Sequence, residues 1–330
     1  MDEQSFGVRL PAGVLPAPRS ISAEARAVLD RLVDADGVAI NAKHPMPGLE
    51  DRDGWVRMKA AVDEHYAAGI KGRAGSVRAS VETVRVGEAP VHIATPETAT
   101  SAAGAYLDLH GGALVFGGGE ACRVGAQIQA DLHGLRCYGV DYRTPPEHPY
   151  PAALEDTLAA YVHVLERHKP SDVVIGGRSA GGNLAVAMLL RAREAGLPMP
   201  AGLVLLSPEV DLTESGDSFA VNRLVDLMLP LPLRAANLLY ADGADLSDPA
   251  LSPLFGELTG LPPTLLQSGT RDLFLSNTVR MHRALRRAGV LAELHVFEAM
   301  PHGGFLGGTP EDLELSGELV RFVHTCLRGS

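Results

Sequence analysis

The residues best suited to chemistry lie in a glycine-rich turn, Gly177-Arg178-Ser179-Ala180-Gly181-Gly182, which fits the pattern G-x-S-x-G. The turn follows the strand-like run 173–175 and precedes a helical pattern, which is the context that the motif requires. The sharp turn strains the backbone of the serine, so the residues two positions away on each side must be tiny, and both are glycine. The pattern predicts that Ser179 is a nucleophile. The alternative is a glycine-rich turn that only packs closely.

A serine nucleophile needs a base and an acid, which in this strand-turn-helix context follow it in the order serine, acid, histidine. Asp272 comes shortly after the strand-like run 264–267, and His302 follows the last such run, 292–297. We expect both side chains on loops beside the serine turn, with His302 as base and Asp272 as acid. Glu298 is the nearest alternative acid. Other histidines fall within predicted helices or strands: His163, His168, His282, His295 and His324.

Acyl transfer also needs backbone donors for the oxyanion of its tetrahedral intermediate. The run His110-Gly111-Gly112-Ala113 ends a predicted strand, and its glycines allow the backbone to approach a ligand closely. We assign the N–H groups of Gly111, Gly112 and Ala180 as the donors of an oxyanion hole. We expect His110 to hold this loop through hydrogen bonds.

The elements that must position these residues alternate along the chain. Eight strand-like runs are recognised by period-two alternation or by short apolar stretches, and helical patterns separate the later ones: 81–86, 91–93, 106–109, 137–141, 173–175, 203–206, 264–267 and 292–297. Strands that alternate with helices predict an α/β fold with a mostly parallel sheet covered on both faces. The first hairpin adds an antiparallel edge. We expect one domain over residues 1–330.

Two segments do not fit the alternation. Residues 1–75 carry helical patterns without a strand signal, and the segment between the runs 203–206 and 264–267 is far longer than one crossover helix requires. Within it, residues 224–240 favour one or two helices. We expect residues 1–75 and about 209–245 to form a helical cap over the carboxyl ends of the strands, where open α/β sheets bind ligands.

Composition excludes several classes of function. The formal net charge of −11 disfavours nucleic acid and anionic membranes as partners. Neither a nucleotide-binding P-loop nor a dinucleotide fingerprint is present, and the three cysteines lack metal-site spacing, so we expect no cofactor and no metal. The start of the chain lacks a basic and then apolar leader, and no apolar run is long enough to span a membrane, so we expect a cytoplasmic protein.

Taken together, these motifs resemble the hormone-sensitive-lipase-like esterases, or family IV, of the α/β-hydrolase superfamily. The resemblance covers roughly residues 80–327 and rests on five matches: His110-Gly111-Gly112, the run 141–153 against DYRLAPEHPFPAA, the run 179–185, the segments 252–254 and 261–263, and the run 301–305. It implies the α/β-hydrolase fold with a cap, Ser179 as nucleophile, Asp272 as acid, His302 as base, and no cofactor. Because family members often dimerise through the last strand, it also implies a homodimer through 292–297.

Two positions depart from the family pattern. Ala113 stands where relatives carry a third glycine, and the donors should survive because alanine keeps its N–H. Arg178 precedes the nucleophile, where relatives usually carry Asp or Thr. We expect Arg178 to pair with a nearby carboxylate, and the alternative is an altered substrate preference.

The expected function is hydrolysis of a small carboxylic ester through an acyl-enzyme, and family analogy favours a short acyl chain. A lactone is the closest rival substrate, and a carbamate or amide could be cleaved by the same groups. A protein of another class, a binding protein with a decayed site, is disfavoured because His302 is present in its motif.

Overall fold

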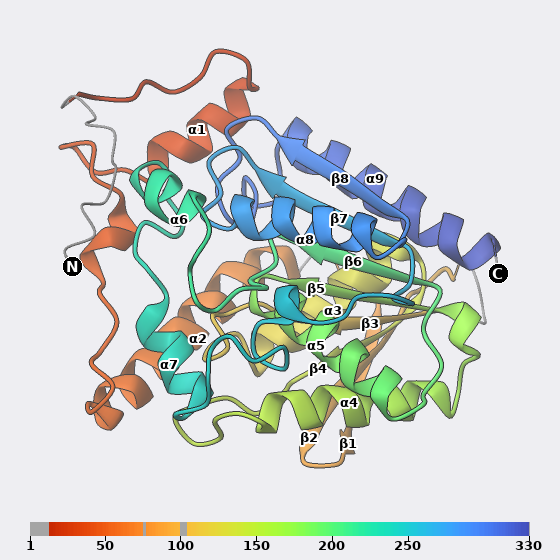
Figure 1. Ribbon diagram of the computed structural model, residues 1–330. Coiled ribbons are helices and arrows are strands. Elements are labelled where there is room, and N and C mark those ends of the chain that lie inside the picture. Colours follow the sequence, from red (N-terminus) through yellow and green to blue (C-terminus); the bar gives the residue numbers. More distant parts are fainter. Residues whose placement is uncertain (1–12, 75–76, 100–103, 330) are drawn as a thin grey trace.

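The computed structural model describes residues 13–74, 77–99 and 104–329. Its centre is a sheet of eight strands in the order β1-β2-β4-β3-β5-β6-β7-β8, as Figure 1 shows. β1 and β2 pair antiparallel, β2 joins β4 antiparallel, and every later pair is parallel. The predicted α/β fold is therefore confirmed. The strands are β1 Ser80–Val86, β2 Ala89–Thr95, β3 Ala105–Leu109, β4 Arg136–Val140, β5 Val173–Arg178, β6 Gly202–Leu206, β7 Thr264–Gly269 and β8 Ala292–Phe297.

Helices cover both faces of the sheet. One face packs against α4, α5 and α8, and the other against α3 and α9. Their bounds are α3 Glu120–His133, α4 Ala152–Leu165, α5 Ala180–Glu194, α8 Leu275–Arg287 and α9 Pro310–Arg328. α9 begins at Pro310 because Thr309 and Asp312 form a reciprocal capping box before it and proline is favoured in the first turn of a helix.

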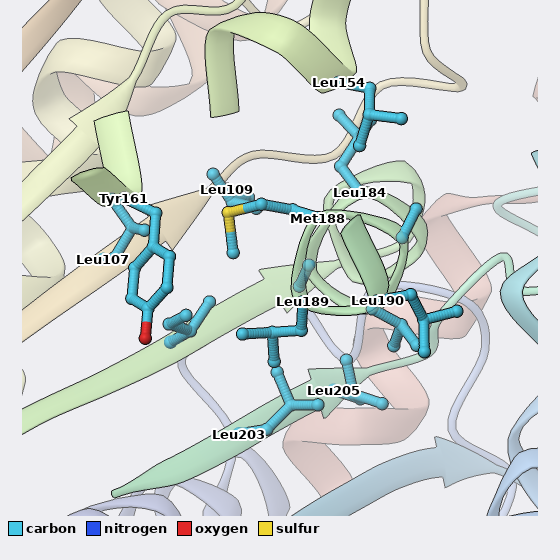
Figure 2. Close-up of a cluster of buried hydrophobic side chains, with 14 of the residues drawn as sticks. Leu107, Leu109, Leu154, Tyr161, Leu184, Met188, Leu189, Leu190, Leu203 and Leu205 are labelled. Atoms are coloured by element: carbon cyan, nitrogen blue, oxygen red, sulfur yellow. The ribbon is translucent and has the colours of Figure 1, made fainter. Parts of the chain in front are cut away.

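The alternation of side chains along each strand divides the core into two layers. Leu107 and Leu109 of β3 point into the layer shared with α4 and α5, whereas Tyr106 joins the layer under α3 and α9. Figure 2 shows the first layer, in which Leu184 and Met188 of α5 pack against the strands. α5 is almost wholly buried, so the start of this helix, which follows the serine, is fixed on all sides.

Four helices outside these layers belong to the segments that the sequence assigns to a cap. They are α1 Ala23–Arg31, α2 Arg52–Ala74, α6 Ser218–Val221 and α7 Arg234–Ala241. In Figure 1, α1, α6 and α7 lie at the side of the sheet toward which the arrows of β7 and β8 point. Residues 1–12 and 75 of the expected N-terminal cap segment lie outside the described residues.

The sequence predicts one or two helices within residues 224–240, and the structure forms one of them, α7, over residues 234–240 of that range. After a short 3₁₀ turn, Asn222–Leu224, the chain stays non-helical until α7 begins at Arg234. Pro230 and Pro232 lack the backbone donor that a helix needs, and each disfavours helical geometry at the residue before it. The apolar spacing in this stretch instead serves packing against α1 and α2, to which Leu227 and Leu229 contribute.

Within the described segments, no helix combines the length and apolar character needed to cross a bilayer.

Candidate active site

Ser179 occupies the turn between β5 and α5 in a strained conformation. Its φ of 55° and ψ of −120° lie in a region that side chains rarely adopt. A Cβ at Gly177 would collide with the backbone of Gly181, and one at Gly181 would collide with the carbonyl of Leu109, so both must be glycine. The N–H of Ser179 donates to the carbonyl of Leu206 at 2.9 Å, which ties the turn to the neighbouring strand.

The structure brings the three residues selected from the sequence into one hydrogen-bonded chain. Nε2 of His302 lies 3.0 Å from Oγ of Ser179, and Nδ1 lies 3.0 Å from Oδ1 of Asp272. Asp272 is fully buried, while Ser179 and His302 are 5% and 9% exposed. Glu298, the alternative acid, is exposed, and none of the hydrogen bonds among the described residues joins it to His302.

The surroundings of Asp272 keep it ionised. Oδ1 also accepts the N–H of Phe274 at 2.9 Å, and Oδ2 accepts the hydroxyl of Ser268 at 2.6 Å. Burial alone would raise the pKa of Asp272, but the charge and hydrogen bond of His302 and the hydroxyls of Ser207 and Ser268 outweigh it and lower the pKa below its ordinary value. The carboxylate can therefore stabilise a protonated His302.

The loop after β3 approaches the serine closely. A Cβ at Gly111 would lie 3.2 Å from Cβ of Ser179, and one at Gly112 would collide with the carbonyl of Phe116. Gly112 has a φ of 135°, which favours glycine. Within the described part of the chain, no acceptor is found for the backbone N–H of Gly111, Gly112 or Ala180, the three donors that the sequence selects.

His110 stabilises this loop from behind. Its ring stacks on Tyr142 with centroids 4.1 Å apart, and the hydroxyl of Tyr142 donates to the carbonyl of His110 at 2.8 Å. Nδ1 lies 2.9 Å from the carbonyl oxygen of Gly111. Burial lowers the pKa of His110, so the ring is neutral near pH 7 and Nδ1 serves as donor.

Arg178 lies behind the serine and contacts the histidine loop. Its Nη1 donates to the carbonyl oxygen of Gly303 at 2.9 Å, one residue after His302. Its charge also lowers the pKa of half-buried Asp108 of β3, which burial raises to about 7. The ion pair with a carboxylate expected for Arg178 stays a prediction.

Two further carboxylates support the loops that carry the candidate site residues, and sequence reasoning missed both. Asp63 of α2 accepts the N–H of Gly117 at 2.7 Å and so fixes the loop that carries the candidate oxyanion donors. Asp226, in the segment between β6 and β7, accepts backbone N–H groups from both the acid loop and the histidine loop. The only available signal was the run Asp226-Leu227-Met228-Leu229-Pro230, because Asp before a proline-containing stretch favours a turn.

One group of side chains beside this loop has the residue types of a metal site. In the described residues, the ligand atoms of His110, Cys122 and Asp141 lie within 4.8 Å of one another. Burial raises the pKa of the Cys122 thiol well above its ordinary value, and Asp141 already accepts the N–H of Gly119 at 3.0 Å. Asp141 also lies 3.6 Å from Nε2 of His92, and the absence of a metal stays a prediction from the sequence.

Comparison with known proteins agrees with the α/β-hydrolase fold. The family model described as alpha/beta hydrolase fold matches residues 106–306. An acetyl-hydrolase of Streptomyces hygroscopicus is 37% identical over 198 residues, which are 59% of this chain and 66% of that protein. The crystal structure of an esterase named E25 superposes with a TM-score of 0.88 at 33% identity, covering 96% of this chain and 98% of that one.

A second solved structure identifies a family within this superfamily. An esterase from the bacterial hormone-sensitive lipase family superposes with a TM-score of 0.77 at 31% identity, covering 93% of this chain and 99% of that one. Together with the nearly complete overlap with E25, this match supports the resemblance seen in the sequence motifs. The chain belongs to the hormone-sensitive-lipase-like esterases of the α/β-hydrolase superfamily and is a carboxylic ester hydrolase.

Proposed function

We propose that Ser179, His302 and Asp272 hydrolyse a carboxylic ester in two steps through an acyl-enzyme. His302 takes the proton of Ser179 while Oγ attacks the acyl carbon, and the protonated imidazole then donates to the leaving alkoxide. Water repeats the sequence on the acyl-enzyme and releases the acid. The observation that carries this proposal is the pair of 3.0 Å contacts that His302 makes with Ser179 and Asp272.

The oxyanion formed in each step requires donors that are already in place. In this proposal the N–H groups of Gly111, Gly112 and Ala180 supply them, because no protein acceptor among the described residues occupies them. Loss of one such donor typically lowers kcat by about 10²–10³. Phe274 packs edge-on against the imidazole of His302 with centroids 4.8 Å apart, which supports a fixed ring orientation.

The experiment that tests the proposed nucleophile is Ser179→Ala, assayed with p-nitrophenyl acetate. We expect kcat to fall by several orders of magnitude while the circular-dichroism spectrum and melting temperature stay close to those of the unaltered protein. The matched control is Ser268→Ala, which also removes a buried hydroxyl but leaves the nucleophile in place. Near-normal turnover by the Ser179 variant would overturn the assignment.

We further propose that the substrate is a small ester with a short acyl chain. The name of the Streptomyces relative, an acetyl-hydrolase, supports this class. A series of p-nitrophenyl esters from acetate to decanoate, run beside γ- and δ-lactones and an anilide, separates it from its rivals. We expect the highest kcat/KM with acetate or butyrate, and faster turnover of a lactone than of any ester would move the function to lactone hydrolysis.

We propose that residues up to 75 and about 209–245 form a cap within a single domain, that the chain is cytoplasmic, and that it binds neither nucleic acid nor membranes.

We propose a homodimer through β8. This strand is the last of the sheet, and Val296 within it and Leu291 next to it are exposed, which supports the dimer. Light scattering on Val296→Lys against the unaltered protein tests the dimer, and an unchanged mass would contradict it.

A further inference from the structure

One buried carboxylate next to the proposed triad has no place in the chemistry described so far. Asp226 is 1% exposed and lies in the non-helical stretch between β6 and β7. Its Oδ1 accepts the N–H groups of Met228 and Leu229 at 2.9 and 3.1 Å, which form the local turn. These two bonds fix the side chain within its own segment.

The other bonds of Asp226 join two loops that are distant in the sequence. Oδ2 accepts the N–H of Leu273, the neighbour of Asp272, at 2.7 Å. Both carboxylate oxygens lie 3.3 Å from the backbone N of His302. The carboxylate therefore holds the acid loop and the histidine loop together through their backbones. An asparagine could not do the same, because its NH₂ group would face backbone donors.

The charge of Asp226 also acts on the triad. The titratable groups that act on it are Asp272 on the acid loop and His302 on the histidine loop. Burial first, and then repulsion from Asp272, raise the pKa of Asp226 to about 6, while attraction to His302 opposes the rise. Two carboxylates beside one imidazole favour its protonated form, which is the form that the reaction generates.

We propose that Asp226 is a positioning residue that couples the segment between β6 and β7 to the catalytic histidine. It sets the distance between the loops of Asp272 and His302, and its negative charge favours the protonated imidazole that the reaction generates. This inference rests on the proposed triad. Through Asp226, the segment between β6 and β7 takes part in catalysis in addition to its proposed place in the cap.

The test is Asp226→Asn, with Asp211→Asn as matched control. Asp211 belongs to the same segment and is fully buried and hydrogen-bonded, but its partners are Thr213, Ser215 and Arg280. For Asp226→Asn we expect kcat to fall roughly 10–100-fold with KM within about threefold, because alignment is lost and binding is not. The acidic limb of kcat/KM should move down by about 0.5–1 pH unit, because a less basic imidazole stays deprotonated to lower pH.

Either of two results for Asp226→Asn would overturn the inference. One is a kcat and a pH profile for Asp226→Asn that match those of the Asp211→Asn control. The other is a lower melting temperature with an unmoved acidic limb, which would show a purely structural role. Asp226→Glu restores the charge and should return the limb toward its original position, and failure to do so would also contradict the inference.

The unaltered enzyme gives an independent check if the variants fail to fold. Because protonation of either Asp226 or His302 lowers the rate, log kcat/KM should fall at low pH with a slope above one at its steepest, and a slope that never exceeds one contradicts the inference. The result for Ser179→Ala separates the two proposals. Activity retained by that variant would refute the triad itself. Activity lost there but unchanged in Asp226→Asn would refute only the role of Asp226.

Discussion

The substitution Asp272→Asn tests how this site uses its buried acid. Oδ1 accepts from both Nδ1 of His302 and the N–H of Phe274, whereas the remaining hydrogen bonds of the carboxylate come from hydroxyls, those of Ser268 (to Oδ2) and Ser207. A hydroxyl can turn and accept a proton, but a backbone N–H cannot. The asparagine oxygen should therefore take the place of Oδ1, with its NH₂ group donating to Ser268. His302 would keep the tautomer that accepts the proton of Ser179.

The expected loss then comes from the missing charge and not from a wrong tautomer. A carboxylate and an imidazolium in contact, about 4 Å between charge centres, attract by roughly 4 kcal/mol at an effective dielectric constant near 20. Each 1.36 kcal/mol is a factor of ten in rate, so the full loss would be about 10³. The retained neutral hydrogen bond recovers part of it, and we expect kcat to fall about 10²–10³-fold.

The assay is kcat/KM for p-nitrophenyl acetate between pH 5 and 10. Without the carboxylate the imidazole is less basic, so the acidic limb should move to lower pH and the plateau should stay flat above it. A loss of 10⁴ or more that recovers at high pH would show a flipped amide and refute the orientation argued here. A loss below tenfold would show that the charge is not used. Ser268→Ala alone should cost less than about tenfold in kcat, because it removes one neutral hydrogen bond.

Other changes test neighbouring parts of the account. Gly112→Ala should abolish activity or folding, because its Cβ would collide with the backbone. Ala113→Gly should keep activity and raise the melting temperature slightly, since Ala113 has a φ of 53°. Equal effects of the two substitutions in activity and melting assays would contradict this. Arg178→Ala should lower kcat about tenfold for every acyl chain length, because the carbonyl of Gly303 loses its hydrogen bond. A fall in kcat confined to some chain lengths would instead show that Arg178 contributes to substrate preference. Burial raises the pKa of Glu209 to about 8, so its folded form binds more protons than its unfolded form between about pH 4.5 and 8, and stability falls across that window. Glu209→Gln should therefore raise the melting temperature more at pH 8 than at pH 5, and an equal shift at both values would contradict the buried charge.

The fold could be predicted from the sequence because its signals are local. Each strand shows alternation or a short apolar run, and the helices between strands require parallel pairing. The positions of Ser179, Asp272 and His302 were selected for the same reason, since the carboxyl ends of parallel strands meet at one edge. The prolines at 230 and 232, which interrupt the helix, are visible in the sequence. The apolar residues between 224 and 240 nevertheless have helical spacing, which predicts more helix than the structure forms.

The supporting residues could not be predicted in this way. Asp226 binds the backbone N–H groups of Leu273 and His302, and a backbone donor leaves no residue type to recognise in the sequence. Asp63 likewise accepts the N–H of Gly117 from a helix more than fifty residues earlier in the chain. Such contacts follow only from the packing of segments that lie far apart in the sequence.

In the proposed reaction Ser179 becomes covalently acylated, with His302 as its base. This is tested by intact-mass measurement and peptide mapping after treatment with a p-nitrophenyl alkylphosphonate, for the unaltered enzyme and for His302→Ala. We expect one phosphonyl group per chain, on Ser179, formed at least about 10³-fold more slowly in the variant. An adduct on another residue, or labelling of Ser179 at the same rate without the imidazole, would contradict it.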